Sequence, residues 1–276
     1  MSTPAATVGG RRAGSGRTAW SAIWPPLVFG IGFLVLWELA VKVFDFQPYF
    51  LPAPSAIRQE FTQNADLIWE ATKVSGLNAL IGLLVGTALG IAIAFLLGRF
   101  RLLNDLVAPL AIALNAIPIF VLVAIFNNMF SITSEVPRRL MVTLVVYFIV
   151  LVNVARGLRE VEATQLELMR SYAASEITIL RKVRVPNAVP YLFTALRIAA
   201  PASVITAFVS EYFGGSQNGL GSRIVASISI SKNAAAWAYV LGACLLGLAF
   251  YLVAVGLERF ATPGGASARR ARRDTA

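Results

Sequence analysis

Few side chains of this protein are suited to catalysis. The 276 residues include no histidine and a single cysteine, Cys244, which lies inside an apolar run. Without histidine, the chain has no imidazole for acid–base catalysis or for binding a metal. The stretch 214–220 has glycines like those of a phosphate-binding loop, but it lacks the lysine that such a loop needs. We therefore predict that the chain is not an enzyme, holds no cofactor and hydrolyses no ATP itself.

Three charged residues stand within long apolar runs, where burying a charge is costly and marks a candidate for function. Glu211 is expected either to line a pathway or to pair with a neighbouring helix, and the sequence favours neither. Glu38 is expected to lie at the interface between membrane and water or to be paired within the bundle. Arg197 is expected to extend its long side chain toward water.

Uncharged residues interrupt the same runs. Asn78 and Asn115 can form hydrogen bonds between helices in an apolar environment. Pro118 is expected to kink the helix that contains it. Asn115, Pro118, Arg197 and Glu211 are our candidates for residues of a pathway through the protein.

The most polar internal stretch is the segment 156–190, which has the composition of a folded segment. Two short amphipathic helices fit it, with a hinge near 173–175. Apolar residues share one face of each helix at helical spacing: Leu166, Met169 and Tyr172 in the first, and Ile177, Leu180 and Val183 in the second. We expect Pro186 to end the second helix and Pro190 to open the next apolar run in its first turn.

The elements that position these residues are expected to cross a membrane. The chain is 57% hydrophobic and only 14% charged, whereas soluble domains are about a quarter charged. A helix needs about 20 apolar residues to span the hydrocarbon core. Because the apolar runs are long and do not alternate with polar residues, helices are favoured over barrel strands.

Six such spans are predicted, so the fold class is an all-α transmembrane bundle. They cover about 24–44, 74–98, 105–126, 139–155, 191–212 and 234–257. A short amphipathic helix from Ser55 to about Trp69 is expected between the first two spans. In the second span, Gly76, Gly82, Gly86 and Gly90 are expected to allow close helix packing.

The distribution of charge predicts the orientation of the spans. The transmembrane domain is expected at 21–260, between a disordered tail at 1–20 and a basic tail at 261–276. Basic residues concentrate in both tails and in the connections on their side, including the segment 156–190. Because basic connections favour the cytoplasm, we predict that both tails are cytoplasmic. The opposite connections carry fewer basic residues: Arg58, Lys73, Arg138, Arg139, Arg223 and Lys232.

In the segment 156–190, Glu167 is followed by Ala173-Ala174-Ser175 and, eleven residues after Ala174, by Val185-Pro186. This pattern resembles the EAA loop of bacterial ABC importer permeases. Ala173 stands where the family usually has glycine, and Val185 where it usually has leucine. In that family the loop docks into a cleft of an ATPase subunit. The resemblance thus implies an ATPase-coupling site formed by Glu167, Arg170, Tyr172, Ala173, Ala174, Ser175, Val185 and Pro186. Pairing of Glu167 with Arg170 within one helix is the alternative.

Further motifs resemble the nitrate, sulfonate and taurine branch of these permeases. They are Leu51-Pro52-Ala53-Pro54-Ser55, the run from Pro109 to Pro118, and Glu211 followed by Gly214-Gly215 and Gly219-Leu220-Gly221. Asn115 replaces a common arginine, and the loop 127–139 lacks the usual glycines.

The resemblance implies a set of partners and a range of solutes. The partners are ATPase subunits that bind ATP and magnesium, a second copy or a related permease, an extracytoplasmic binding protein and the lipid bilayer, with no nucleic acid. The solute would be a sulfonate, taurine, nitrate, or a heterocycle such as a pyrimidine or riboflavin.

Other functions remain open at the level of sequence. A secondary transporter would show inverted repeats and broken helices around an ion site, and the chain shows no such symmetry. An intramembrane enzyme would need a catalytic pair within the spans. A membrane anchor or assembly protein would not need an ATPase partner.

Overall fold

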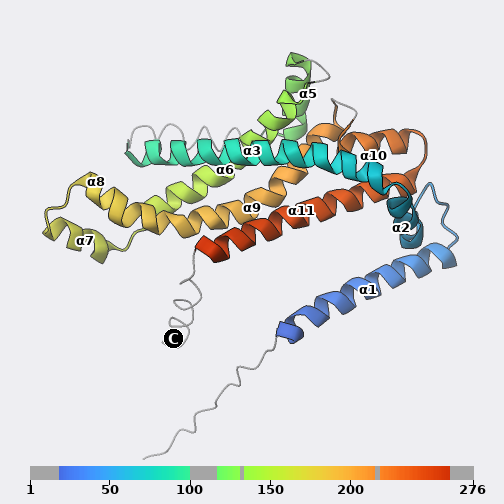
Figure 1. Ribbon diagram of the computed structural model, residues 1–276, viewed down its shortest axis with the longest axis horizontal. Coiled ribbons are helices and arrows are strands. Elements are labelled where there is room, and N and C mark those ends of the chain that lie inside the picture. The colour runs from blue at the N-terminus through green and yellow to red at the C-terminus, as the bar shows by residue number, and fades with distance from the viewer. Residues whose placement is uncertain (1–18, 100–116, 131–133, 215–217, 262–276) are drawn as a thin grey trace, which may run out of the picture.

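The computed structural model describes residues 19–99, 117–130, 134–214 and 218–261, and all regular elements in these ranges are helices (Figure 1). They are α1 (Ala19–Val43), α2 (Pro54–Gln63), α3 (Ala65–Arg99), α5 (Ile119–Met129), α6 (Val136–Arg159), α7 (Ala163–Ser171), α8 (Glu176–Ile179), a π-helical turn (Leu180–Arg184), α9 (Val185–Tyr212), α10 (Leu220–Ser229) and α11 (Asn233–Ala261). The predicted all-α fold is confirmed.

Within the described ranges, five helical segments are long and apolar enough to cross a membrane: Trp24–Val43, Ala65–Gly98, Val136–Arg159, Glu176–Tyr212 and Asn233–Ala261. They correspond to five of the six predicted spans. The remaining span, 105–126, lies mostly outside the described residues, which include only its last part as α5. Most of the tails at 1–20 and 261–276 lies outside them too.

The core of the bundle forms where α3 runs parallel to α6. Gly82, Gly86 and Gly90 of α3 face valines of α6, and a Cβ added at Gly82 would lie 2.4 Å from Val142 Cβ. The predicted role of these three glycines in close packing is confirmed. Gly76 differs, because its nearest neighbour is Leu246 of α11 at 3.4 Å, an ordinary contact.

The other long helices join this pair from different sides. α9 packs antiparallel to α6, and α11 lies along α9 and α3. α1 lies apart from the bundle, as Figure 1 shows, and contacts it near its C-terminal end. There, Glu38 accepts hydrogen bonds from Ser55 and pairs with Lys42 at 2.9 Å, and Trp37 lies edge-on to Trp237. Glu38 is therefore paired, one of the two arrangements expected from the sequence.

Two predicted helix boundaries near α2 were wrong. The amphipathic helix ends at Gln63, not near Trp69, and the next span begins at Ala65, not at 74. Asn64 separates the helices, and its side chain bonds to the carbonyl oxygen of Glu60 at 3.2 Å. Residues 65–73 are amphipathic, with Ile68 and Ala71 buried, so they extend α3 beyond its apolar part.

The prediction that Pro186 ends a helix was also wrong. The chain stays helical from Glu176 to Tyr212, with Pro186 in the first turn of α9 and Pro190 inside that helix. In the preceding π-helical turn, the Val185 amide bonds to the carbonyl of Leu180. This wider turn shifts the hydrogen-bond register just before Pro186, so the missing proline amide does not break the helix.

Candidate functional site

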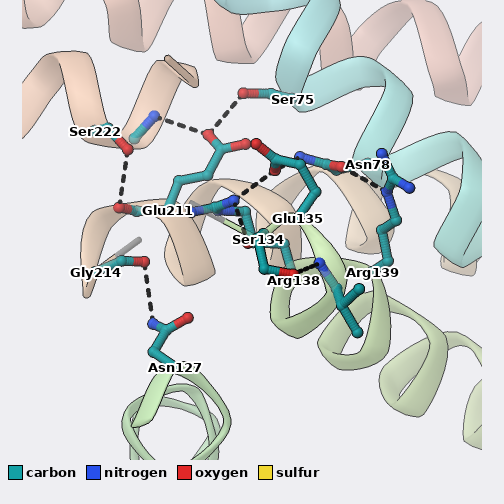
Figure 2. A network of polar contacts seen from close by, with 12 residues as sticks. Ser75, Asn78, Asn127, Ser134, Glu135, Arg138, Arg139, Glu211, Gly214 and Ser222 are labelled. Carbon is teal, nitrogen blue, oxygen red and sulfur yellow. Dashed lines mark hydrogen bonds and ion pairs between the residues drawn. The ribbon is translucent and has the colours of Figure 1, made fainter. Parts of the chain in front are cut away.

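Two polar regions stand out, one inside the bundle and one at its end. The inner region joins α3, α6, α9 and the start of α10 (Figure 2). Ser75 and Asn78 lie about 15 and 20 Å from the start of α3, at a rise of ~1.5 Å per residue. The region is therefore well inside a helix long enough to cross the membrane.

Glu211 is the central acceptor of this inner network. Its Oε2 accepts hydrogen bonds from the Ser75 hydroxyl at 2.7 Å and from the Gly221 amide at 3.1 Å. Ser75 Oγ in turn accepts from the Leu220 amide at 2.9 Å. Two side chains from other helices thus satisfy amides in the first turn of α10, which have no partners within the helix. Glu211 is therefore paired with neighbouring helices, one of the two arrangements that the sequence left open.

Two glycines make this contact possible. A Cβ at Gly219 would lie 2.2 Å from the carboxyl carbon of Glu211, and a Cβ at Gly221 would lie 2.3 Å from the carbonyl oxygen of Phe208. Both distances are far below a normal contact, so the spacing Gly219-Leu220-Gly221 is required by the close approach of α10 to α9.

The other half of the network centres on Glu135, just before α6. Its carboxylate accepts hydrogen bonds from Asn78 at 2.7 Å and from Arg138, and Arg139 donates to Asn78 Oδ1 at 3.0 Å. Asn78 thus bonds between helices, as the sequence predicted. Arg138 is only 1% exposed. Its Nε and Nη2, and Oε1 of Glu211, are buried and form no hydrogen bond to the described residues.

The second region is the segment from α7 to the π-helical turn, which projects at the end of the bundle opposite α2 and α10 (Figure 1). Its large apolar side chains are exposed: Leu168 by 55%, Tyr172 by 76% and Ile177 by 69%. Glu167 and Arg170 are exposed as well, and they form no ion pair with each other. The alternative interpretation of Glu167, a pair with Arg170, is therefore not supported.

The hinge of this segment has a defined backbone conformation. The Ala173 amide bonds to the carbonyl of Arg170 at 2.9 Å, and the Ala174 amide to that of Met169 at 3.0 Å. This pair of bonds is the Schellman motif, which ends a helix with one left-handed residue. That residue is Ala173, with φ of 49°. Ser175 then caps α8 by accepting from the Thr178 amide at 3.3 Å.

A group of polar contacts attaches this segment to the bundle. Asn187 of α9 donates to the carbonyl oxygens of Gly157 and Glu160 at 2.8 and 3.0 Å. The Glu160 carboxylate accepts from Tyr191 at 2.9 Å and from Arg156 at 2.7 Å. These hydrogen bonds, from Arg156 first and Tyr191 second, lower the pKa of the Glu160 carboxyl. We call Arg156, Glu160, Asn187 and Tyr191 the α6–α9 clamp.

Sequence reasoning missed the clamp. A Cβ at Gly157 would lie 2.8 Å from the ring of Tyr191, so glycine is needed where α9 crosses α6. Gly157 and Asn187 were the available signals, but they lie 30 residues apart, and nothing local shows that they meet.

The remaining predicted residues lie in different places. Val185 and Pro186 begin α9 and are partly exposed and exposed, respectively. Arg197 pairs with Glu258 of α11 at 3.1 Å. Pro118 directly precedes α5 and is itself not helical, with φ of −58° and ψ of 125°. Asn115 lies outside the described residues.

Comparisons with known proteins agree with this architecture. Residues 86–264 match the family described as binding-protein-dependent transport system inner membrane component. A probable ABC transporter permease protein of Haemophilus influenzae is 32% identical over 73% of this chain and 81% of its own length. The formylaminopyrimidine transport permease protein ThiX of Halalkalibacterium halodurans is 30% identical over 74% of this chain and 81% of its own length.

A solved structure shares the fold. The inward-facing MetNI methionine ABC transporter matches with a TM-score of 0.55 over 71% of this chain and 94% of the matched chain, at 19% identity. Because the family match covers most of the bundle, and relatives align over about three quarters of the chain, this protein is a multi-pass membrane protein of the binding-protein-dependent transport system inner membrane component family, the permease subunits of ABC importers.

Proposed function

We propose that the projecting segment 163–186 is the surface through which separate ATPase subunits drive this permease. The observation that carries the proposal is the exposure of Leu168, Tyr172 and Ile177 on a folded segment outside the bundle. Exposed apolar side chains grouped in this way mark a contact surface for another protein. Glu167 and Arg170 add charges that are free to pair with a partner.

The length of the helices supports a position outside the membrane. The helical run from Glu176 to Tyr212 has 37 residues, or roughly 55 Å at 1.5 Å per residue. The hydrocarbon core is only about 30 Å thick. The excess lets α8 and the π-helical turn extend beyond the membrane while the rest of α9 crosses it. The α6–α9 clamp ties this extension to two spans, so a displacement of α7 would move both.

The transport cycle follows from this attachment. Two permeases, either two copies or one copy and a related chain, form the pathway, and the ATPases bind ATP and magnesium. Closure of the ATPases moves the segment 163–186 as a lever and reorients the spans, with both tails in the cytoplasm.

A binding protein delivers the solute on the opposite side. The solute is a sulfonate, taurine, nitrate, or a pyrimidine-like or riboflavin-like heterocycle. Arg197, Glu211, Pro118 and Asn115 are proposed to influence the pathway.

A matched pair of tyrosine variants tests the coupling surface. Tyr172 and Tyr49 are both exposed, by 76% and 64%, at opposite ends of the bundle. After co-expression with an ABC ATPase subunit that copurifies with the wild type, Tyr172→Asp should lower the amount of copurified ATPase at least about tenfold, which corresponds to ~1.4 kcal/mol. Tyr49→Asp should leave it unchanged. Equal copurification with both variants would overturn the proposal.

The orientation has its own test. In a Cys244→Ala background, a single cysteine at position 172 should react with a membrane-impermeant maleimide only after the cells are opened. A cysteine at position 49 should react in intact spheroplasts. The reverse pattern would contradict the proposed orientation.

A further inference from the structure

A second group of charged side chains lies at the end of the bundle that carries α2 and α10, apart from the network in Figure 2. It lines a cavity of about 230 Å³ between α2, α3, α10 and α11. The polar residues in its wall are Glu60, Asn64, Arg223, Ser227, Lys232 and Tyr239. Neither the family resemblance nor the ATPase-coupling surface accounts for these residues.

The two cations of this cavity have no acidic partner. No carboxylate of the described residues lies within 4.0 Å of Arg223 or Lys232. Glu60 also lines the cavity, but its carboxylate accepts a hydrogen bond from Asn64 at 2.9 Å. The wall therefore carries one more positive than negative charge. In addition, Arg223 Nε is buried and donates to no described residue. A buried donor without an acceptor costs about 1–3 kcal/mol, so an acceptor entering the cavity would be favoured.

The backbone that carries these cations is held in place. The amides in the first turn of α10 bond to Glu211 and Ser75, and Ser227 donates to the carbonyl of Arg223 at 2.8 Å. Lys232 follows Ser231, which adopts φ of 59°, and the Lys232 amide bonds to the carbonyl of Ser227 at 2.9 Å. The backbone positions of Arg223 and Lys232 are thus set before any ligand arrives, so only their side chains need to become ordered on binding.

The position of the cavity indicates where its ligand comes from. Asn64 in its wall precedes α3 and Ile68 lies in the first turn of α3, so the cavity stands at the end of a helix that is long enough to cross the membrane. Trp69 and Phe50 are exposed at the same end by 62% and 70%, as aromatic residues are at the level of lipid headgroups. Leu67, in the cavity wall, is half exposed and apolar, which suits contact with the upper part of an acyl chain.

The size and charge of the cavity then define the ligand. Pockets that enclose a whole small molecule measure about 300–1,000 Å³, and this one is smaller. A tetrahedral oxyanion fits its excess positive charge and offers acceptors to Arg223 Nε, Lys232 and the Tyr239 hydroxyl. We propose that this cavity binds the phosphate of an anionic phospholipid headgroup, with Arg223 and Lys232 as the phosphate-binding residues. Free inorganic phosphate has the same oxyanion chemistry and is the alternative source.

Lipid retention by the purified permease tests the proposal. The full-length protein, extracted and reconstituted in nanodiscs of phosphatidylglycerol and phosphatidylcholine in equal amounts, is analysed by native mass spectrometry after release into detergent. The wild type should retain phosphatidylglycerol over phosphatidylcholine, and Arg223→Gln/Lys232→Gln should lose at least about tenfold of this preference. The control is Arg58→Gln/Lys73→Gln, which removes the same charge from the same end outside the cavity and should keep the preference.

Three results would overturn the proposal. An equal loss in both double variants would mean that only the net charge matters. An unchanged preference in Arg223→Gln/Lys232→Gln would exclude the cavity. Displacement of the retained lipid by millimolar inorganic phosphate would assign the site to free phosphate. Lys232→Gln alone, at an exposed position, should lose part of the preference without loss of folding, which is checked by an unchanged thermal midpoint in phosphatidylcholine. If that variant folds and keeps the full preference, Lys232 is not a phosphate-binding residue.

Discussion

The inner network and the projecting segment use the same residue types in opposite ways. Glu211 and Arg138 are 2% and 1% exposed. Glu211 accepts hydrogen bonds from α3 and α10, and Arg138 donates to Glu135, which also accepts from Asn78 of α3. Glu167 and Arg170 are exposed and form no ion pair with described residues. Charges that are bonded across helices fix the positions of those helices. Charges and apolar side chains left free at the end of the molecule are available to another protein.

Removing one acidic side chain from each region should give the largest difference in the free energy of unfolding. Glu211→Ala leaves the Ser75 hydroxyl and the Gly221 amide without their acceptor. At about 1–3 kcal/mol for each unsatisfied buried group, we expect a loss of about 2–5 kcal/mol in the free energy of unfolding. Glu167→Ala should not measurably change this free energy, because that side chain is exposed and forms no ion pair within the described ranges of the chain. Unfolding in mixed micelles by increasing SDS measures both. Comparable losses in the two variants would mean that the inner network does not hold the helices together.

Replacing glycine by alanine should destabilise the protein at a close helix contact and not at an open position. At Gly221 an added Cβ would lie 2.3 Å from a backbone oxygen, whereas at Gly30 it would meet nothing within 4 Å. Gly221→Ala should therefore destabilise the protein by about 1–3 kcal/mol through overpacking. Gly30→Ala, the control, should be neutral or slightly stabilising. A neutral Gly221→Ala would show that α10 does not approach α9 as closely as the structure indicates.

Replacing alanine by glycine should stabilise the hinge of the projecting segment. Ala173 is left-handed, which costs a non-glycine residue roughly 1–2 kcal/mol, partly offset by the greater flexibility of glycine in the unfolded chain. Ala173→Gly should stabilise the hinge by up to about 1 kcal/mol, seen as slower hydrogen exchange at 169–174. Ala174→Gly, the control, should speed exchange there. Faster exchange in Ala173→Gly would contradict the Schellman geometry.

The smallest expected effect is the pH dependence of the stability that the α6–α9 clamp contributes. The folded-state pKa of Glu160 is lowered from 4.5 by its hydrogen bonds to Arg156 and Tyr191. Its contribution to stability is therefore present above pH 4.5 and is lost as the pH falls through the lower, folded-state value. Glu160→Gln should show a smaller drop in thermal midpoint than the wild type over that acid range, with Glu167→Gln as the control. An identical drop in wild type and Glu160→Gln would exclude the ionised clamp.

What could be predicted from the sequence follows from how local each signal is. Five of the six predicted spans, the packing role of Gly82, Gly86 and Gly90, and the two helical stretches within 163–184 follow from periodicity within one segment, and the structure contains them. The helical path through Pro186 was missed because a π-helical turn at 180–184 leaves no composition signal. The Ser75–Glu211–Gly221 contacts and the α6–α9 clamp join residues up to 136 positions apart, so only the folded chain shows them.

Hydrogen exchange of the permease, alone and in complex with its ATPase subunit, tests most directly whether the projecting segment is the contact surface. Amides in 163–179 should become protected on complex formation. Amides in 211–214 and 218–229 should exchange slowly in both states, because the hydrogen bonds around Glu211 hold this region in place. Protection confined to the residues around Glu211, with 163–179 unchanged, would contradict this account.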